Sequence, residues 1–242
     1  DTPAAVATCM WANNETGAIQ PVADITQRAA AQNTPVHIDA VQVAGKLPIN
    51  FHELGATTLA ASAHKFGGPR GIGLLLARRT PAPQPIAFGG GQERGIRPGT
   101  VDVASASALA AALRESVAEM EQEEIRLTAL RDKLKAGIES SIDNVIINSA
   151  EPTLASHLHV SFPGTDGDSL IMLLDAAGIE ASAGSACHAG VNRMSHVLEA
   201  MGIDEEHGRG SLRFSLGRMT TEEDIDAVLA GLPEIIRRAR SV

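Results

Sequence analysis

A lysine between an apolar segment and a pair of glycines is the first residue of this sequence that could do chemistry. Lys65 follows the apolar segment 59–63 and precedes, after one phenylalanine, Gly67 and Gly68. An amine at the rim of a cleft, partly removed from water, can form a Schiff base with a carbonyl compound. A lysine exposed in a surface turn has the same sequence pattern. Lys65 is therefore a candidate amine, with the surface turn as the other interpretation.

A carboxylate closes another short segment of strand character, residues 36–39. Asp39 is the last residue of that segment, and Gln42 follows three positions later. A buried carboxylate at this place could hold a proton on a ring nitrogen of a bound cofactor. A helix N-cap or a loop salt bridge would use the same residue type. Both interpretations of Asp39 stay open.

A thiol lies in a segment of small residues, 182–190. Cys187 is flanked there by alanine and His188, with glycine at 184 and at 190. A cysteine in such a loop can act as a nucleophile, and a neighbouring histidine can assist it. A buried, inert cysteine is the alternative, because adjacency in sequence does not establish a side-chain pair. The second cysteine, Cys9, lies within an apolar segment, and we expect it to be inert.

An arginine stands on the polar side of an alternating segment, residues 211–216. Leu212, Phe214 and Leu216 share one face, and Arg213 shares the other with Ser215. A guanidinium can bind a carboxylate through two parallel hydrogen bonds. A solvated strand face would show the same alternation. Arg213 is therefore a candidate carboxylate-binding residue.

The composition excludes several classes of protein. The 242 residues are 44% hydrophobic and 20% charged, which is typical of a globular protein and not of a disordered or fibrous chain. The formal net charge is −9, which disfavours binding to nucleic acid or to an anionic membrane. No apolar run approaches the ~20 residues of a membrane span. With two cysteines and no signal-type leader, we expect a cytoplasmic protein.

The first half of the chain alternates strand and helix patterns. The apolar run 4–12 predicts a strand buried on both faces, and Pro21 marks the start of a helix. Further strands are expected at 36–39, 59–63 and 71–77, which together predict a mainly parallel α/β sheet. Ligands bind at the carboxyl ends of such strands. The polar residues expected there are Asn14, Asp39, Gln42, His64 and Lys65.

The second half predicts a different domain. Helical spacing runs from 103 to 138, and we expect a bend near 118–122 that separates a domain of residues 1–119 from one of residues 120–242. Strands are predicted at 158–162 and 212–216. Helices are predicted near 168–178, 194–201 and 221–238, the last with a capping box formed by Thr220 and Glu223. This pattern is typical of a smaller α+β domain.

Taken in order, these segments resemble one family over nearly the whole chain. The motifs are Asn13-Asn14-Glu15-Thr16-Gly17, Asp39-Ala40-Val41-Gln42, Ser62-Ala63-His64-Lys65, Gly89-Gly90-Gly91-Gln92-Glu93-Arg94-Gly95, Gly184-Ser185-Ala186-Cys187 and Arg213-Phe214-Ser215-Leu216-Gly217-Arg218. Together they resemble the cysteine desulfurases of the NifS type, which are class V aminotransferase-like enzymes of pyridoxal 5'-phosphate (PLP) fold type I. The resemblance implies the C-terminal part of that fold: the remnant of a mainly parallel sheet with helices, then the small α+β domain.

The resemblance also implies roles in cofactor binding. Lys65 resembles the lysine that holds PLP as a Schiff base, and Asp39 resembles the partner of its ring nitrogen. Gln42 is similar to the residue that hydrogen-bonds the phenolic oxygen of the cofactor. The remaining cofactor residues implied are Ser62 and His64 at the phosphate, Asn14 near the ring, and Thr100, which reaches the phosphate of the partner subunit.

The implied reaction converts L-cysteine to L-alanine. Arg213 resembles the residue that binds the substrate carboxylate, with Asn14 also near the substrate. Cys187 resembles the nucleophile that takes the sulfur and becomes a persulfide. The family passes that sulfur to an acceptor such as an iron–sulfur scaffold protein or a tRNA-thiolation carrier. The resemblance further implies a homodimer. From the composition and the residues themselves we expect no nucleic acid, membrane or metal.

The sequence departs from the family pattern at one place. The family has a glycine- and threonine-rich phosphate turn and a histidine that stacks on PLP, and neither motif occurs in these 242 residues. The chain therefore resembles an N-terminally truncated desulfurase. Two alternatives follow: a selenocysteine lyase or other class V PLP enzyme, and a catalytically silent fragment that acts in dimerisation or scaffold binding.

Overall fold

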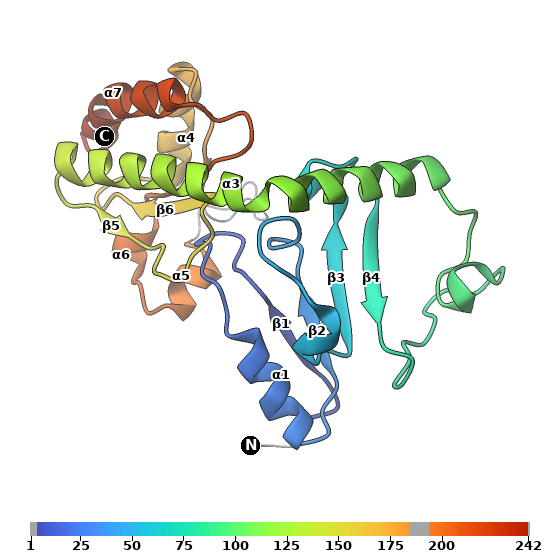
Figure 1. Cartoon of the computed structure of the whole chain (residues 1–242). Helices are drawn as coiled ribbons and strands as arrows, with labels where there is room; N and C mark the ends of the chain where they lie inside the picture. The colour runs from blue at the N-terminus through green and yellow to red at the C-terminus, as the bar shows by residue number, and fades with distance from the viewer. Residues whose placement is uncertain (1–3, 184–193, 242) are drawn as a thin grey trace. The chain divides into compact units, whose positions relative to one another are not determined.

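The computed structural model of the chain describes residues 4–183 and 194–241. They form two compact units (Figure 1). The first contains residues up to 12 together with 20–120, and the second contains residues 13–19 together with those from 121 onward. The dividing point, between Met120 and Glu121, lies within the long helix α3 (Val103–Ser141). Residues 13–19 therefore cluster with the second unit, whereas the predicted boundary at 119 assigns them to the first domain.

The first unit contains a four-stranded sheet in the order β1-β2-β3-β4. Its strands are β1 (Ala7–Met10), β2 (Val36–Asp39), β3 (Thr58–Ser62) and β4 (Gly73–Ala77). β1, β2 and β3 are parallel, and β4 runs antiparallel to β3. Helix α1 (Val22–Ala31) connects β1 to β2, and the short helix α2 (Phe51–Leu54) precedes β3. The prediction of a mainly parallel α/β sheet is confirmed.

The strand in the run 4–12, which we predicted to be buried on both faces, is more exposed than expected. Only four residues of the run 4–12 form β1, and β2 is its only partner in the described sheet. Val6 before it is 59% exposed. An edge strand lacks a neighbour on one side, so its apolar residues are covered less than those of β2, where Val36 and Ile38 are buried. The run 4–12 thus predicted a strand, and the described residues supply a neighbour on one side of it.

The N-terminal half of helix α3 packs on the core of the first unit. Leu109, Ala112 and Leu113 pack there against the segment that follows β3. Ser116 Oγ of α3 donates a hydrogen bond to Phe66 O at 2.9 Å. The helix is one continuous element across residues 118–122, and the bend expected there stays a prediction.

The second unit contains an antiparallel sheet in the order β5-β6-β8-β7. Its strands are β5 (Ile146–Ile147), β6 (His157–Ser161), β7 (Ser182–Ala183) and β8 (Ser211–Ser215). Its helices, besides the C-terminal half of α3, are α4 (Gly167–Ala176), α5 (His196–Ala200), α6 (Glu205–Gly208) and α7 (Glu222–Ala239). The predicted strands at 158–162 and 212–216 and the three predicted helices are present, with ends that differ by a few residues.

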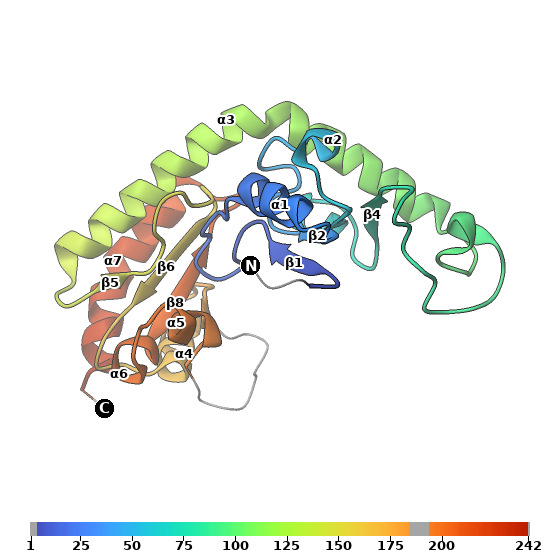
Figure 2. The same ribbon diagram turned by 90° about the horizontal axis from the view of Figure 1, so that it is seen from below.

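One face of this second sheet is apolar and packs against helices. Alternate residues of β6 and β8, such as Leu158, Val160 and Leu212, share one core with α3, α4 and α7. Figures 1 and 2 both show α7 beside the C-terminal half of α3, where Lys133 forms ion pairs with Glu222 (2.8 Å) and Asp226. The opposite sheet face carries the polar residues of the same strands. This alternation places Arg213 on the polar face, away from the core.

The capping box of α7 lies one residue later than predicted. Thr221 Oγ1 accepts from Asp224 N at 3.2 Å, and Thr221 N donates to Asp224 Oδ2 at 2.8 Å. Thr220 instead accepts from Gly217 N through its hydroxyl at 2.9 Å. Two threonines in succession each have an acidic residue three positions later, and the turn from Gly217 decides which one caps the helix.

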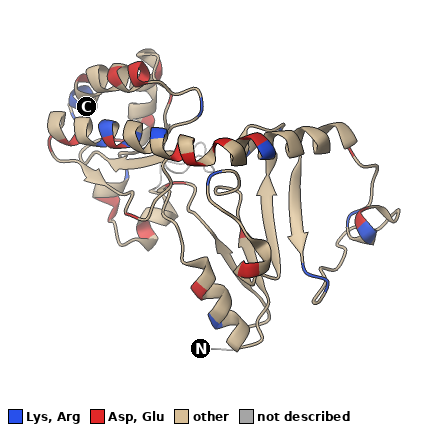
Figure 3. Cartoon of the chain, in the orientation of Figure 1, with Lys and Arg blue, Asp and Glu red and all other residues tan. Residues whose placement is uncertain are grey.

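Charged side chains lie mainly on helices and turns (Figure 3). In α7, acidic residues occupy the first turn and Arg237 and Arg238 the last, as the helix dipole favours. No helix within residues 4–183 and 194–241 is both long and apolar enough to span a membrane.

Candidate functional site

The carboxyl ends of two parallel strands in the first unit carry a group of polar residues. Asp39 ends β2 and Ser62 ends β3, and the parallel pairing places both ends at the same edge of the sheet. A one-turn 3-10 helix, η1 (Ala63–Phe66), follows Ser62 and carries His64 and Lys65. Four of the predicted site residues therefore share this edge. Parallel α/β sheets bind their ligands at this edge.

Two glycines, Gly67 and Gly68, fix the turn that carries Lys65. Gly67 has a φ of 85°, which ends η1 in the left-handed region. Gly68 N donates to Ala63 O at 2.8 Å, and a Cβ at Gly68 would lie 2.9 Å from Ala63 Cβ. The main chain at residue 68 can approach Ala63 this closely only if that residue is glycine. Lys65, which is half-buried, is thus held on a short rigid turn rather than on a loose loop.

The side chains beside Lys65 present hydrogen-bonding groups. Ser62 Oγ and His64 Nδ1 lie 2.8 Å apart, and His64 is exposed. Asp39 Oδ1 accepts from Val41 N at 2.9 Å, which starts the turn leading to Gln42. Gln42 is buried, with 6% of its surface exposed. A hydroxyl–imidazole pair suits an anion such as a phosphate, and the carboxylate suits a protonated nitrogen.

A second lysine of the first unit, Lys46, is linked electrostatically to Lys65. Burial, and then the charge of Lys65, lower the pKa of Lys46 to about 8. The sequence analysis missed Lys46. The only signal in the sequence is its place after the mostly apolar segment 40–44 and Gly45.

Thr100 lies apart from these residues. It belongs to the segment between β4 and α3, which Figure 1 shows beyond the β4 edge of the first sheet. Its side chain is exposed. The structure does not bring Thr100 to Asp39 or Lys65 within this chain, and its role at a partner subunit stays a prediction.

In the second unit, the structure brings Arg213 and Asn14 together. Arg213 Nη1 donates to the main-chain carbonyl of Asn14 at 2.9 Å, and Nη2 donates to Ser182 Oγ at 3.2 Å. Arg213 Nε is buried and has no hydrogen-bond partner in the described part of the chain. Ser182, on β7, is a contact that the sequence analysis missed.

The motif around Asn14 forms a tight turn. Asn13 Oδ1 accepts from the main-chain nitrogens of Glu15 (2.8 Å) and Thr16 (2.9 Å). Gly17 has a φ of 77°, and a Cβ there would lie 2.7 Å from His157 Cβ. The side chain of asparagine and the missing side chain of glycine therefore let the turn lie directly against the start of β6.

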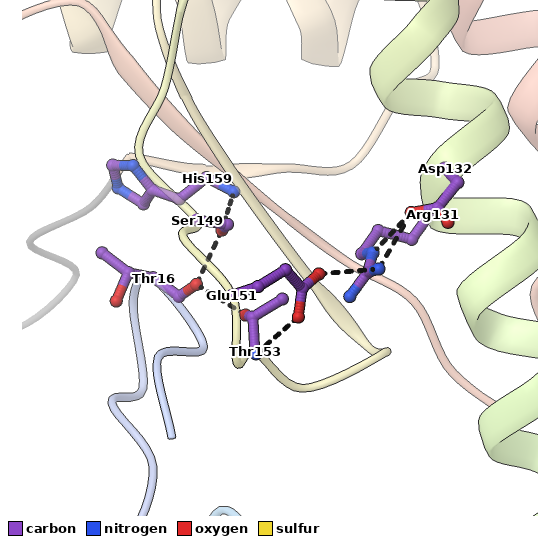
Figure 4. Close-up of polar contacts among 7 residues, drawn as sticks. All are labelled: Thr16, Arg131, Asp132, Ser149, Glu151, Thr153 and His159. Atoms are coloured by element: carbon purple, nitrogen blue, oxygen red, sulfur yellow. Dashed lines mark hydrogen bonds and ion pairs between the residues drawn. The ribbon is translucent and has the colours of Figure 1, made fainter. Parts of the chain in front are cut away.

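Polar contacts from residues 149–153 hold the same turn (Figure 4). Ser149 Oγ donates to Thr16 O at 2.6 Å and accepts from His159 N at 2.9 Å. Thr153 Oγ1 donates to Thr16 O at 3.3 Å. Arg131 of α3 forms an ion pair with Glu151 at 3.1 Å, which ties the segment to the helix.

Glu15 is a buried carboxylate that the sequence analysis left without a role. It is 4% exposed and accepts a hydrogen bond from Ser195 Oγ at 2.5 Å. The pKa of Glu15 is raised, and burial is the largest cause. The Ser195 hydrogen bond and the charges of His196 and Arg213 act in the opposite direction and lower it. Glu15 is thus a titratable carboxyl group close to the predicted carboxylate-binding arginine, whose charge acts on it.

The two cysteines differ in what the structure shows. Cys187 lies outside the described residues. Cys9 on β1 is half-buried, its thiol donates to Met10 O at 3.1 Å, and burial raises its pKa. A protonated thiol in this position is a poor nucleophile, in agreement with the expected inert role.

The chain matches known proteins along almost its whole length. A family model described as aminotransferase class-V matches residues 1–228. An "IscS-like cysteine desulfurase" of Mycobacterium tuberculosis is 49% identical over 238 residues, which cover 98% of this chain and 61% of that protein. "Cysteine desulfurase NifS" of Azotobacter vinelandii is 39% identical over 239 residues, which cover 98% of this chain and 60% of that protein.

Solved structures show the same likeness. A NifS-like protein from Rickettsia africae superposes with a TM-score of 0.88 at 30% identity, over 95% of this chain and 61% of that one. Another NifS-like protein gives a TM-score of 0.85 at 37% identity, over 96% of this chain and 60% of that one. The chain thus spans about 60% of the length of the relatives it matches.

Proposed function

Because this chain belongs to the aminotransferase class-V family, we propose that it forms part of a PLP-dependent cysteine desulfurase. The observation that carries the proposal is the group formed by Asp39, Ser62, His64 and Lys65 at one sheet edge. The names of the relatives support the choice of reaction. In that reaction L-cysteine and the Cys187 thiol give L-alanine and a Cys187 persulfide.

The side chains at this edge fit PLP by their chemistry. The cofactor needs an amine for its aldehyde, a carboxylate opposite its ring nitrogen and hydrogen-bond donors for its phosphate. Lys65 would supply the amine, Asp39 the carboxylate, and Ser62 and His64 the donors, with Gln42 beside them. When bound, PLP supplies an electron sink for the bonds broken at the substrate. The rigid turn at Gly67 and Gly68 would keep the Lys65 amine in place.

The second unit would hold the substrate carboxylate. Arg213 has two nitrogens fixed by Asn14 O and Ser182 Oγ, so its planar fork is held in one orientation. A guanidinium in a fixed orientation binds a carboxylate with two parallel hydrogen bonds at a lower entropy cost than a mobile one. Asn14 would lie beside the substrate, as predicted.

The finer parts of the proposal concern what happens to the sulfur. We propose that the persulfide sulfur passes to an acceptor, such as an iron–sulfur scaffold protein, for iron–sulfur cluster or thio-cofactor synthesis. We further propose a cytoplasmic homodimer in which Thr100 reaches the phosphate held by the other subunit. Mixing Thr100→Ala protein with Lys65→Ala protein tests that last point. If the site is shared between subunits, one of the two sites in the mixed dimer has both Lys65 and Thr100 intact and regains activity.

The first experiment is an absorption spectrum of the purified chain with added PLP, followed by borohydride reduction and peptide mapping. A visible band with the label on Lys65, lost in Lys65→Ala, is expected. A label scattered over many lysines would overturn the assignment of Lys65 and favour a silent dimerisation or scaffold-binding piece. Turnover of L-cysteine then distinguishes a desulfurase from a selenocysteine lyase, and Cys187→Ala should retain PLP but lose sulfur transfer.

A further inference from the structure

One peptide group of the second unit, between Asn14 and Glu15, is held at both of its polar atoms. Its carbonyl oxygen, Asn14 O, accepts from Arg213 Nη1 at 2.9 Å. Its amide, Glu15 N, donates to Asn13 Oδ1 at 2.8 Å. A trans peptide group is planar, so its C=O and its N–H point in opposite directions and rotate together. The contact with Arg213 is therefore made only while Glu15 keeps its main-chain position.

The carboxyl group of Glu15 holds that residue from its other side. Glu15 is 4% exposed, and Ser195 Oγ donates to its Oε2 at 2.5 Å. A polar group this deeply buried costs desolvation free energy unless it has a hydrogen-bond partner. Glu15 therefore favours the conformation in which its carboxyl group contacts Ser195, and that conformation fixes the peptide group before it.

Ser195 is itself fixed at the start of α5. It is 4% exposed, and its hydroxyl oxygen accepts from Val197 N at 3.1 Å as the cap of the helix. Its main-chain oxygen accepts from Glu199 N at 3.0 Å. The hydroxyl gives its proton to Glu15 and a lone pair to the helix. The contact between Glu15 and Ser195 thus joins the first turn of α5 to the peptide group that contacts Arg213.

In the described part of the chain, Arg213 is held by neutral oxygens. Its Nη1 and Nη2 donate to Asn14 O and to Ser182 Oγ. A carboxylate bonded directly to the guanidinium would compete with the carboxylate of a substrate. The charge of Arg213 acts on Glu15, so the two are near one another, but Glu15 takes its hydrogen bond from Ser195. Glu15 can thus orient the arginine through the main chain and leave its charge for a ligand.

We propose that Glu15 is a positioning residue, which through its hydrogen bond to Ser195 fixes the peptide group that orients Arg213 and couples this arginine to the start of α5. The inference rests on the proposed function, in which Arg213 binds the substrate carboxylate. Cys187 lies shortly before Ser195 in the sequence. An anchor at Ser195 therefore also limits how far Cys187 can lie from the bound carboxylate, because the chain between them has a fixed length.

The kinetic test replaces Glu15 in the PLP-loaded protein that contains this chain. Glu15→Leu removes the acceptor, and we expect KM for L-cysteine and the inhibition constant of propionate to rise about tenfold. Propionate has neither thiol nor amine, so its inhibition constant reports on carboxylate binding. Glu15→Gln keeps an oxygen that can accept from Ser195 and should restore most of the loss. Glu139→Leu, the same change at an exposed carboxylate of α3, is the control. Unchanged KM and propionate inhibition in Glu15→Leu would overturn the proposal.

A double-substitution cycle tests the route through Ser195. Ser195→Ala alone should raise the inhibition constant of propionate, as Glu15→Leu does. If both act through one hydrogen bond, the doubly substituted protein should be no worse than the more impaired single variant. Effects that multiply in the double variant would show that the two residues act separately, and this would overturn the proposed coupling.

Hydrogen exchange gives a readout that does not depend on turnover. In ¹⁵N-labelled protein, Glu15→Leu should speed the exchange of Val197 N–H and of the Arg213 Nη1 protons about fivefold, whereas Glu139→Leu should change neither. Unchanged exchange at Arg213 in Glu15→Leu would overturn the proposal. Absence of L-cysteine turnover together with faster exchange would reject the proposed function and still support the positioning role, so the two failures are distinguishable.

Discussion

Glu15 and Ser195, which are 180 positions apart in sequence, form a buried hydrogen bond of 2.5 Å in the second unit. Ser195 uses the same hydroxyl to accept from Val197 N at 3.1 Å, which caps α5. One carboxylate thus joins the turn that bears Asn14 to the start of a helix. Because Asn14 O holds Arg213, a change at Glu15 acts on the same turn that orients the guanidinium.

The first prediction concerns how stability depends on pH through Glu15. Its pKa is raised in the folded protein, so the folded state keeps the proton to higher pH than the unfolded state does. Its contribution to the unfolding free energy is therefore complete below the ordinary pKa of 4.5 and is lost as pH rises through the raised value. Glu15→Gln cannot ionise, and it should lose less stability between about pH 4 and pH 7 than the unsubstituted chain. Thermal unfolding followed by circular dichroism across that range checks this. Equal slopes in the two proteins would contradict it.

The second prediction separates two costs of replacing glycine in the Asn13–Gly17 turn. Gly17 and Gly178 have similar positive φ values, 77° and 72°, but only Gly17 has atoms within 4 Å of an added Cβ. Gly178→Ala should therefore cost only the backbone strain, about 1–2 kcal/mol of unfolding free energy. Gly17→Ala adds the clash with His157 and should cost about 1–3 kcal/mol more. Denaturant unfolding of both variants measures the difference, and equal losses would show that the turn moves away from β6 at little cost.

The third prediction concerns acid sensitivity from His159. Its pKa falls from 6.5 to about 4 on folding, so the unfolded state binds the proton first as pH falls. The contribution of His159 to stability is complete above about pH 6.5 and is lost as pH drops toward 4. The gap corresponds to about 3 kcal/mol of unfolding free energy. His159→Gln should remove most of this acid-dependent loss, with His52→Gln, at an exposed histidine of α2, as the control. Parallel pH profiles for the unsubstituted and His159→Gln chains would show that His159 is not buried in neutral form.

Sequence patterns predicted most of the elements because their periodicity reflects burial. Strands β2, β3, β6 and β8 and helices α4 and α7 were expected close to where they lie. The exposure of Val6 before β1 was not expected from the apolar run 4–12. The capping residue of α7 was missed because two successive threonines fit the same motif, and only the contact of Thr220 with Gly217 separates them.

The residues of the candidate site also differ in whether the sequence alone could predict them. Asp39, the last residue of β2, and Lys65, three residues after the end of β3, carry a local signal in the sequence, since each lies at or just after a segment of strand character. Glu15, Ser195, Ser182 and His159 carry none, because their roles depend on partners far along the chain. The alternation in β8 predicted that Arg213 faces away from the core, but not that His159 on the next strand lies beside it.

The last prediction concerns the two amines of the first unit. Burial lowers the pKa of Lys46 most, and the charge of Lys65 lowers it further, to about 8. Lys65→Met removes that charge, so the pKa of Lys46 should rise while staying below the ordinary 10.5, because burial remains. The rate of acetylation of Lys46 as a function of pH, followed by mass spectrometry, gives the pKa, and Arg70→Met, at an exposed cation after the same glycine pair, is the control. An unchanged Lys46 midpoint in Lys65→Met would place the two amines beyond electrostatic reach of one another. A rise seen only in Lys65→Met would make Lys46 a reporter of the charge at Lys65 that requires no turnover.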